Sequence, residues 1–177
     1  MYIWCAIDLD NQLGEIRKHA EEASDALGVG NPALTLPLHI SLKISCEIDD
    51  SRFDEAAGEI SAHFSSINPF EIMPIGIEIC GGVVWIRHRE CRELTELHRW
   101  LVRLFEEKYS SKPHPFDLEF AYHSSLFVGD EEDARRAYEI LKDASLPDRF
   151  TAREFVIGCS ESGRAGEYRV IKTIENK

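Results

Sequence analysis

A tetrapeptide pattern occurs twice in the chain, at equivalent places in a duplicated order of predicted strands and helices. The two copies are His39-Ile40-Ser41-Leu42 and His123-Ser124-Ser125-Leu126, and both lie in runs typical of β-strands, here called the motif strands. Side chains at positions i and i+2 of a strand point to the same face, so each copy presents one imidazole beside one hydroxyl. The duplication predicts internal symmetry, with the two motif strands facing one another.

Hydrophobic periodicity predicts the same run of elements in each half: strand, helix, motif strand, helix, strand. The predicted strands cover residues 2–9, 39–48, 70–79, 83–88, 120–128, 150–159 and 167–174, and the predicted helices cover 13–27, 53–64, 94–105 and 130–141. Residues 39–48 are expected to alternate without interruption. Pro74 cannot donate to a strand ladder, so its strand is expected at a sheet edge. We expect a single bilobal domain, 1–177, with lobe-forming repeats of approximately 1–80 and 81–177.

Length and charge limit the class of protein. A chain of 177 residues with 44% hydrophobic content can bury a sizeable core. The net charge of −12 disfavours an extended nucleic-acid surface, because proteins that bind long polyanions usually present a basic face. A small phosphorylated nucleotide or one RNA terminus can still be held in a cleft. Without a leader-like start or a long apolar run, a cytoplasmic monomer that does not associate with membranes is expected.

Two imidazoles and two hydroxyls in one pocket suit in-line chemistry at a phosphate. One of His39 and His123 would take a proton from the attacking oxygen, and the other would protonate the departing oxygen, since the pKa of imidazole lies near neutrality. Either histidine can take either role. Ser41 and Ser125 would donate hydrogen bonds to the non-bridging oxygens. The spacing of the cysteines and histidines matches no zinc pattern, so neither a metal nor another cofactor is predicted.

Six further residues near the motifs are candidate substrate-binding groups: Lys43, Phe127, Trp4, Trp85, Arg87 and Tyr168. By alternation, Lys43 shares the face of His39 and would bind phosphate, although a solvated lysine fits the same pattern. Phe127 would continue the face of His123 and stack on a base, or pack beneath a loop. The two tryptophans would wall a nucleoside pocket, or serve as aromatic residues buried in a sheet.

The two motifs resemble those of the 2H phosphoesterases, which include bacterial 2′-5′ RNA ligase-like proteins and cyclic nucleotide phosphodiesterases. That family carries two His-x-Thr/Ser-apolar motifs, one per pseudo-symmetric half, and both copies here have Ser where Thr is commoner. The closing stretch 160–170 also resembles the family's final hairpin. The resemblance implies an α+β fold with two pseudo-symmetric lobes, each an antiparallel sheet with outer helices, around a central cleft.

The resemblance also implies metal-independent hydrolysis of 2′,3′-cyclic or other 2′-linked phosphodiesters of nucleotides, RNA ends or related small metabolites. The main alternative is a non-catalytic module that holds a nucleotide or a phosphate ligand in the same cleft. A third is an interaction protein whose acidic surface docks a partner. RNA ligation is less favoured, because a second RNA end must be held near an acidic protein.

Overall fold

Strands and helices follow one another twice in nearly the same order in the computed structural model, which describes residues 1–177. The strands are β1 (Tyr2–Asp8), β2 (His39–Glu47), β3 (Phe70–Ile72), β4 (Pro74–Cys80), β5 (Val83–His88), β6 (His123–Val128), β7 (Phe150–Ala152), β8 (Glu154–Ser160) and β9 (Arg169–Glu175). The helices are α1 (Asp10–Leu27), α2 (Phe53–Phe64), α3 (Arg92–Tyr109), α4 (Pro115–Leu118) and α5 (Glu131–Leu141), with 3₁₀ turns η1 (Pro32–Thr35) and η2 (Asp50–Arg52).

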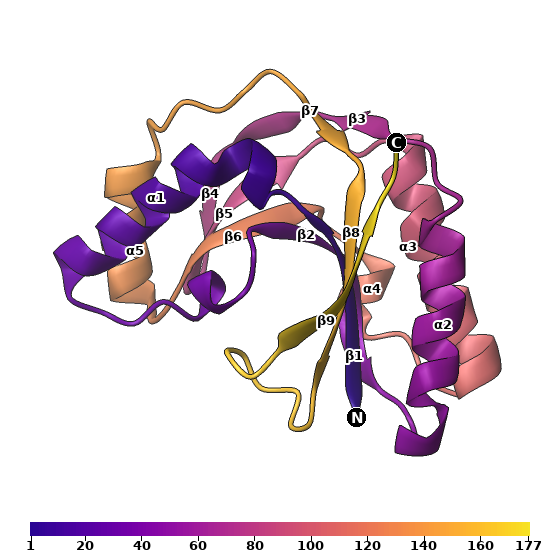
Figure 1. Cartoon of the computed structure of the whole chain (residues 1–177). Helices are drawn as coiled ribbons and strands as arrows, with labels where there is room; N and C mark the ends of the chain where they lie inside the picture. Colours follow the sequence, from indigo (N-terminus) through magenta and orange to yellow (C-terminus); the bar gives the residue numbers. More distant parts are fainter.

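The two motif strands, β2 and β6, lie at the edges of two different antiparallel sheets. One sheet has the order β2-β1-β8-β9 and the other has the order β4-β5-β6. The motif strands contact each other, so the two sheets approach one another along these edges (Figure 1). The predicted α+β class with antiparallel sheets is confirmed.

Each sheet combines strands from both halves of the chain. Strand β4 of the first repeat pairs with β5 of the second, and β8 of the second repeat pairs with β1 of the first. The helices exchange in the same way, because α1 contacts α5 and β6, while α3 contacts β2. In Figure 1, α1 and α5 lie beside β4, β5 and β6, whereas α2 and α3 lie on the other side of the molecule. The expectation that residues 1–80 and 81–177 each form a lobe is therefore corrected, since the repeats interleave.

Some predicted elements are divided or shortened in the structure. The strand predicted over 70–79 is split into β3 and β4, and that over 150–159 into β7 and β8, because β3 and β7 pair with each other as a separate small sheet. β4 is an edge strand, as Pro74 at its start predicts. The motif strand of the second half starts at His123, three residues later than predicted. No helix of the structure has both the length and the apolar character needed to cross a membrane.

Both motif strands carry a β-bulge at the same point of the motif. The register of β2 on β1 passes from Ser41 to Lys43, which leaves Leu42 as an extra residue. The register of β6 on β5 likewise passes from Ser125 to Phe127 around Leu126. A bulge changes the face to which the following side chains point. The uninterrupted alternation predicted for 39–48 is therefore wrong after Leu42.

Candidate active site

The two motif histidines are held by the same local contact. Nδ1 of His39 lies 2.7 Å from the carbonyl oxygen of Pro37, and Nδ1 of His123 lies 2.7 Å from that of Ala121. A carbonyl only accepts hydrogen bonds, so each Nδ1 carries a proton. Nε2 of each neutral ring therefore holds the lone pair that a general base needs, and it becomes a donor when the ring is charged.

Burial lowers the affinity of both rings for a second proton. It lowers the pKa of His39 from 6.5 to about 4; the Pro37 carbonyl opposes this shift, and repulsion from His123 adds to it. Burial also lowers the pKa of His123, against the effect of the Ala121 carbonyl. Because the charge of one ring disfavours a charge on the other, the state in which both imidazoles are protonated is the least favoured.

A cleft of about 270 Å³ brings together residues of both motifs. Its lining includes His39 and Ser41 from β2 and Ser125 from β6, together with Trp4 and Tyr168, whereas His123 is not among the lining residues. Residues 165 and 166, in the turn of the β8–β9 hairpin, complete one wall. The hydroxyls of both motifs therefore share one space, which we call the motif cleft.

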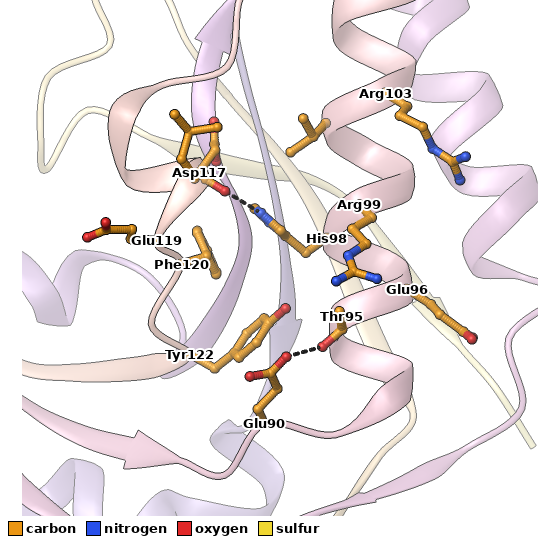
Figure 2. A pocket seen from close by; sticks show the side chains of 12 residues that line it. Glu90, Thr95, Glu96, His98, Arg99, Arg103, Asp117, Glu119, Phe120 and Tyr122 are labelled. Carbon is orange, nitrogen blue, oxygen red and sulfur yellow. Dashed lines mark hydrogen bonds between the residues drawn. The ribbon is translucent and has the colours of Figure 1, made fainter.

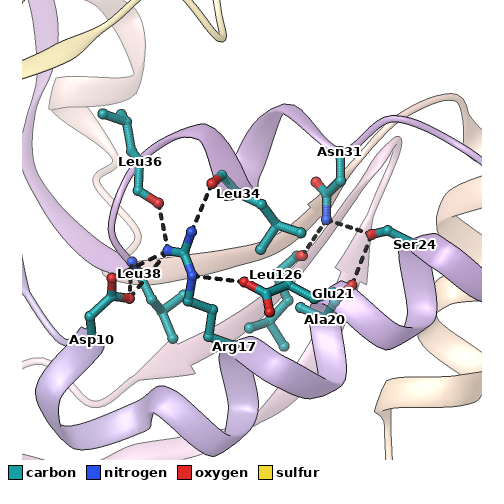
Figure 3. Close-up of polar contacts among 10 residues, drawn as sticks. All are labelled: Asp10, Arg17, Ala20, Glu21, Ser24, Asn31, Leu34, Leu36, Leu38 and Leu126. Carbon is teal, nitrogen blue, oxygen red and sulfur yellow. Dashed lines mark hydrogen bonds and ion pairs between the residues drawn. The ribbon is translucent and has the colours of Figure 1, made fainter.

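The segment before His39 is fixed by a partly buried arginine and its partners (Figure 3). Arg17 on α1 donates to the carbonyl oxygens of Leu36 and Leu34 at 2.8 Å each. It also forms an ion pair with Asp10 at 3.3 Å, and Asp10 accepts a 2.7 Å bond from the backbone N–H of Leu38. These contacts fix the position of the first residue of β2, which is His39.

Two side chains that the sequence did not single out fix the outer edges of the motif strands. Asn31 accepts from the backbone N–H of Val128 at 3.1 Å and donates to the carbonyl of Leu126 at 2.9 Å (the latter bond is drawn in Figure 3). Asp117 on α4 accepts from the backbone N–H of Ile44 at 3.0 Å. Ile44 and Val128 each stand five residues after a motif histidine. The loop that leads into each motif strand therefore holds the motif strand of the other repeat.

Lys43 is among the residues that line the motif cleft, but its ammonium group is buried and paired with Asp117, which corrects the prediction that it binds phosphate. The bulge at Leu42 turns its side chain inward, where it is 3% exposed. Its ammonium group donates to Asp117 at 3.2 Å and to the carbonyl of Ile44 at 2.9 Å. Phe127, the equivalent residue of β6, is fully buried in the core, so the prediction that it stacks on a base is wrong for the same reason.

The other four candidates lie near the motif residues. Trp4 contacts the His39 ring edge-on with centroids 4.6 Å apart, and Trp85 lies against the His123 ring at 4.4 Å. Arg87 on β5 lies directly opposite His123 on β6, and the two side chains point to the same face of the sheet. Its ion pair with Glu78 is long, at 3.6 Å, and half exposed, so the guanidinium can exchange partners.

Tyr168 lies in the wall of the motif cleft, just before β9. Its hydroxyl is 2.6 Å from that of Ser45 on β2 and donates to the carbonyl of Gly163 at 3.3 Å. These contacts connect the β8–β9 hairpin to the motif strand. Tyr168 therefore fixes one side of the cleft and leaves its ring available to a ligand.

A larger hollow of about 800 Å³ lies outside the motif cleft, between α3 and the segment leading into β6 (Figure 2). His98 on its wall places Nδ1 2.9 Å from the carbonyl of Leu42 and Nε2 2.9 Å from that of Asp117. Both ring nitrogens are thus occupied by backbone, and the ring stacks on Phe120. His98 connects α3 to the motif strand and has no free nitrogen for chemistry.

The sequence model of the 2′-5′ RNA ligase superfamily, a group of 2H phosphoesterases, matches residues 7–163. The chain belongs to this superfamily. The match covers both motifs and the side chains of Arg17, Asn31 and Asp117, which hold the motif strands. No curated protein sequence matches this 2H phosphoesterase. No group of three or more His, Cys, Asp or Glu side chains is arranged to hold a metal ion.

Solved structures share the fold of this superfamily member over nearly its full length. The Thermus thermophilus protein TT0787 has 16% identity and a TM-score of 0.61, covering 99% of this chain and 97% of its own. Escherichia coli LigT complexed with 3′-AMP has 19% identity and a TM-score of 0.56, with coverage of 99% and 97%. Kluyveromyces marxianus Usb1 has 15% identity and a TM-score of 0.51, with coverage of 98% and 97%. At these identities the similarity shows the fold alone.

Proposed function

We propose that this protein hydrolyses 2′,3′-cyclic or other 2′-linked phosphodiesters of nucleotides, RNA ends or related small metabolites by two-histidine acid–base catalysis. One observation carries the proposal: two imidazoles with Nδ1 fixed by backbone carbonyls stand on adjoining edge strands, each beside a serine that opens into one cleft. Membership of the 2′-5′ RNA ligase superfamily supports it. LigT structures with 3′-AMP and with phosphate agree with a nucleotide ligand.

The pKa of His39 is lowered more strongly than that of His123, which favours His39 as the general base and His123 as the general acid. His39 keeps its neutral form to lower pH than an ordinary imidazole, so it accepts the proton of the attacking water at Nε2. The water oxygen bonds to phosphorus, and the bond from phosphorus to one ribose oxygen breaks. His123 gives its Nε2 proton to that leaving oxygen. Ser41 and Ser125 donate to the non-bridging oxygens, where negative charge increases.

The activity is tested directly by incubating the purified protein with 2′,3′-cyclic AMP and identifying the products. We expect conversion to one adenosine monophosphate isomer, at a rate that excess chelator does not change. Binding of the nucleotide without any product would contradict the proposal and favour a non-catalytic binding module. Loss of turnover in chelator would contradict the acid–base scheme.

The pKa shifts predict an acidic pH optimum for kcat/KM, which reports ionisations of the free enzyme. Activity requires neutral His39, so it should fall as the pH drops through about 4. It also requires protonated His123, whose pKa lies below 6.5, so it should fall again before neutrality. The optimum of kcat should lie at higher pH, because the bound phosphate anion stabilises an imidazolium. A kcat/KM that still rises above pH 7 would contradict this assignment.

A further inference from the structure

Trp4 and Trp85 occupy equivalent places but use their indole N–H groups differently. Each lies on the first strand of its repeat with its ring against a motif histidine. Nε1 of Trp4 donates to Oγ of Ser41 at 3.1 Å. Nε1 of Trp85 is buried and has no hydrogen-bond partner. The two serines of the site therefore stand in different environments.

The position of Trp4 is determined by its neighbours. Trp4 is 6% exposed and lies opposite Gly158 on β8. A Cβ atom added at residue 158 would come within 2.5 Å of the indole ring, so only glycine leaves room for the indole in this orientation. The ring meets His39 at 80°, edge against face. One side chain therefore fixes both the imidazole and the hydroxyl of the first motif.

From these contacts we propose that Trp4 is a positioning residue that prepares Ser41, and not Ser125, as the principal hydroxyl donor to the substrate phosphate. This inference rests on the proposed function. A serine hydroxyl has one proton and two lone pairs. Since the indole N–H occupies one lone pair of Ser41, the hydroxyl proton points away from the indole and is free for a ligand oxygen. Accepting that bond also strengthens the hydroxyl as a donor.

The hydroxyl of Ser125 accepts no hydrogen bond from an indole N–H. Its hydroxyl faces the motif cleft and must find its orientation when the phosphate binds. Trp85 supports the His123 ring but does not hold the neighbouring hydroxyl. The symmetric fold therefore produces an asymmetric site, in which one serine is preorganised and the other adapts.

The test compares matched variants in two assays, turnover of 2′,3′-cyclic AMP and calorimetric binding of adenosine 3′-monophosphate. We expect Ser41→Ala to lower kcat about tenfold or more. The decrease caused by Ser125→Ala should be several times smaller than that caused by Ser41→Ala. Trp4→Phe keeps an aromatic ring but removes the N–H, and it should lower kcat with little change in KM. Trp85→Phe is the matched control and should lower kcat less than Trp4→Phe does.

The decisive comparison is the double variant. In the Ser41→Ala background, Trp4→Phe should cost less than about twofold, since its effect passes through the hydroxyl that is already absent. Equal losses from Trp4→Phe with and without Ser41, or equal losses from Ser41→Ala and Ser125→Ala, would overturn the inference. If Trp4→Phe does not fold, the serine comparison decides alone. An absence of turnover by the unmodified protein would sink the proposed function. The binding assay would then decide the inference: Ser41→Ala should weaken the binding of adenosine 3′-monophosphate more than Ser125→Ala does, and equal losses would overturn it.

Discussion

Replacing His39 with Ala is expected to lower kcat for 2′,3′-cyclic AMP about 10²–10⁴-fold, and replacing His123 with Ala should cost a similar factor. Each change removes the only Nε2 that can accept or give the proton at its end of the reaction. The double variant should be little worse than either single one, because the two groups act as a unit. Steady-state kinetics on the three variants measures these effects.

His19→Ala is the matched control, because this histidine lies exposed on α1 with no hydrogen bond to another side chain. It should keep the activity of the unmodified protein. Thermal unfolding of each variant separates loss of catalysis from loss of fold. Near-normal turnover by either His39→Ala or His123→Ala would remove the mechanism, because no other titratable group stands in an equivalent position.

The second large effect concerns the buried ion pair that holds β2. Asp117→Ala should lower the free energy of unfolding by about 3–5 kcal/mol. The change leaves the Lys43 ammonium buried without its partner, and it also leaves the backbone N–H groups of Ile44 and His114 without their acceptor. Urea unfolding followed by circular dichroism measures the change.

Arg135→Ala is the control for that experiment, because its ion pair with Glu131 is about 70% exposed on both sides. Its expected effect is within about 0.5 kcal/mol. The pair Lys43→Met with Asp117→Asn should recover part of the lost stability, since no buried charge remains. A loss below about 1 kcal/mol for Asp117→Ala would show that the pair does not hold the strand.

The sequence was sufficient to predict the repeated element order, the two motif strands and the face that their histidines and serines share. Those features depend on local periodicity. The bulges at Leu42 and Leu126 depend on register with the neighbouring strands, and periodicity within one strand carries no information about its partner. The burial of Lys43 and Phe127, each of which directly follows a bulge, could not be predicted for that reason.

The exchange of strands and helices between the two repeats also could not be predicted from local sequence periodicity. An element order does not say which strands pair, so β4 and β8 were each expected to stay with their own half. Asn31 and Asp117 act on strands far away in the sequence. Their only local signals were that Asn31 stands directly before Pro32 and that Asp117 ends the polar, proline-containing stretch 110–117, and both also fit ordinary turn chemistry.

The exchanged contacts give a physical reason for placing a site at two sheet edges. An edge strand has one row of unpaired backbone groups and is less constrained than a central strand. Asn31 and Asp117 each occupy part of that row with a side chain from the loop that leads into the other motif strand. The position of each histidine is therefore tied to the strand that carries the other.

The most direct measurement is a crystal structure of the protein with adenosine 3′-monophosphate. Our account predicts the phosphate in the motif cleft, within hydrogen-bond distance of Nε2 of both His39 and His123 and of the Ser41 hydroxyl. A phosphate bound instead in the hollow beside α3, or one in contact with a single imidazole while the other ring faces away, would contradict it.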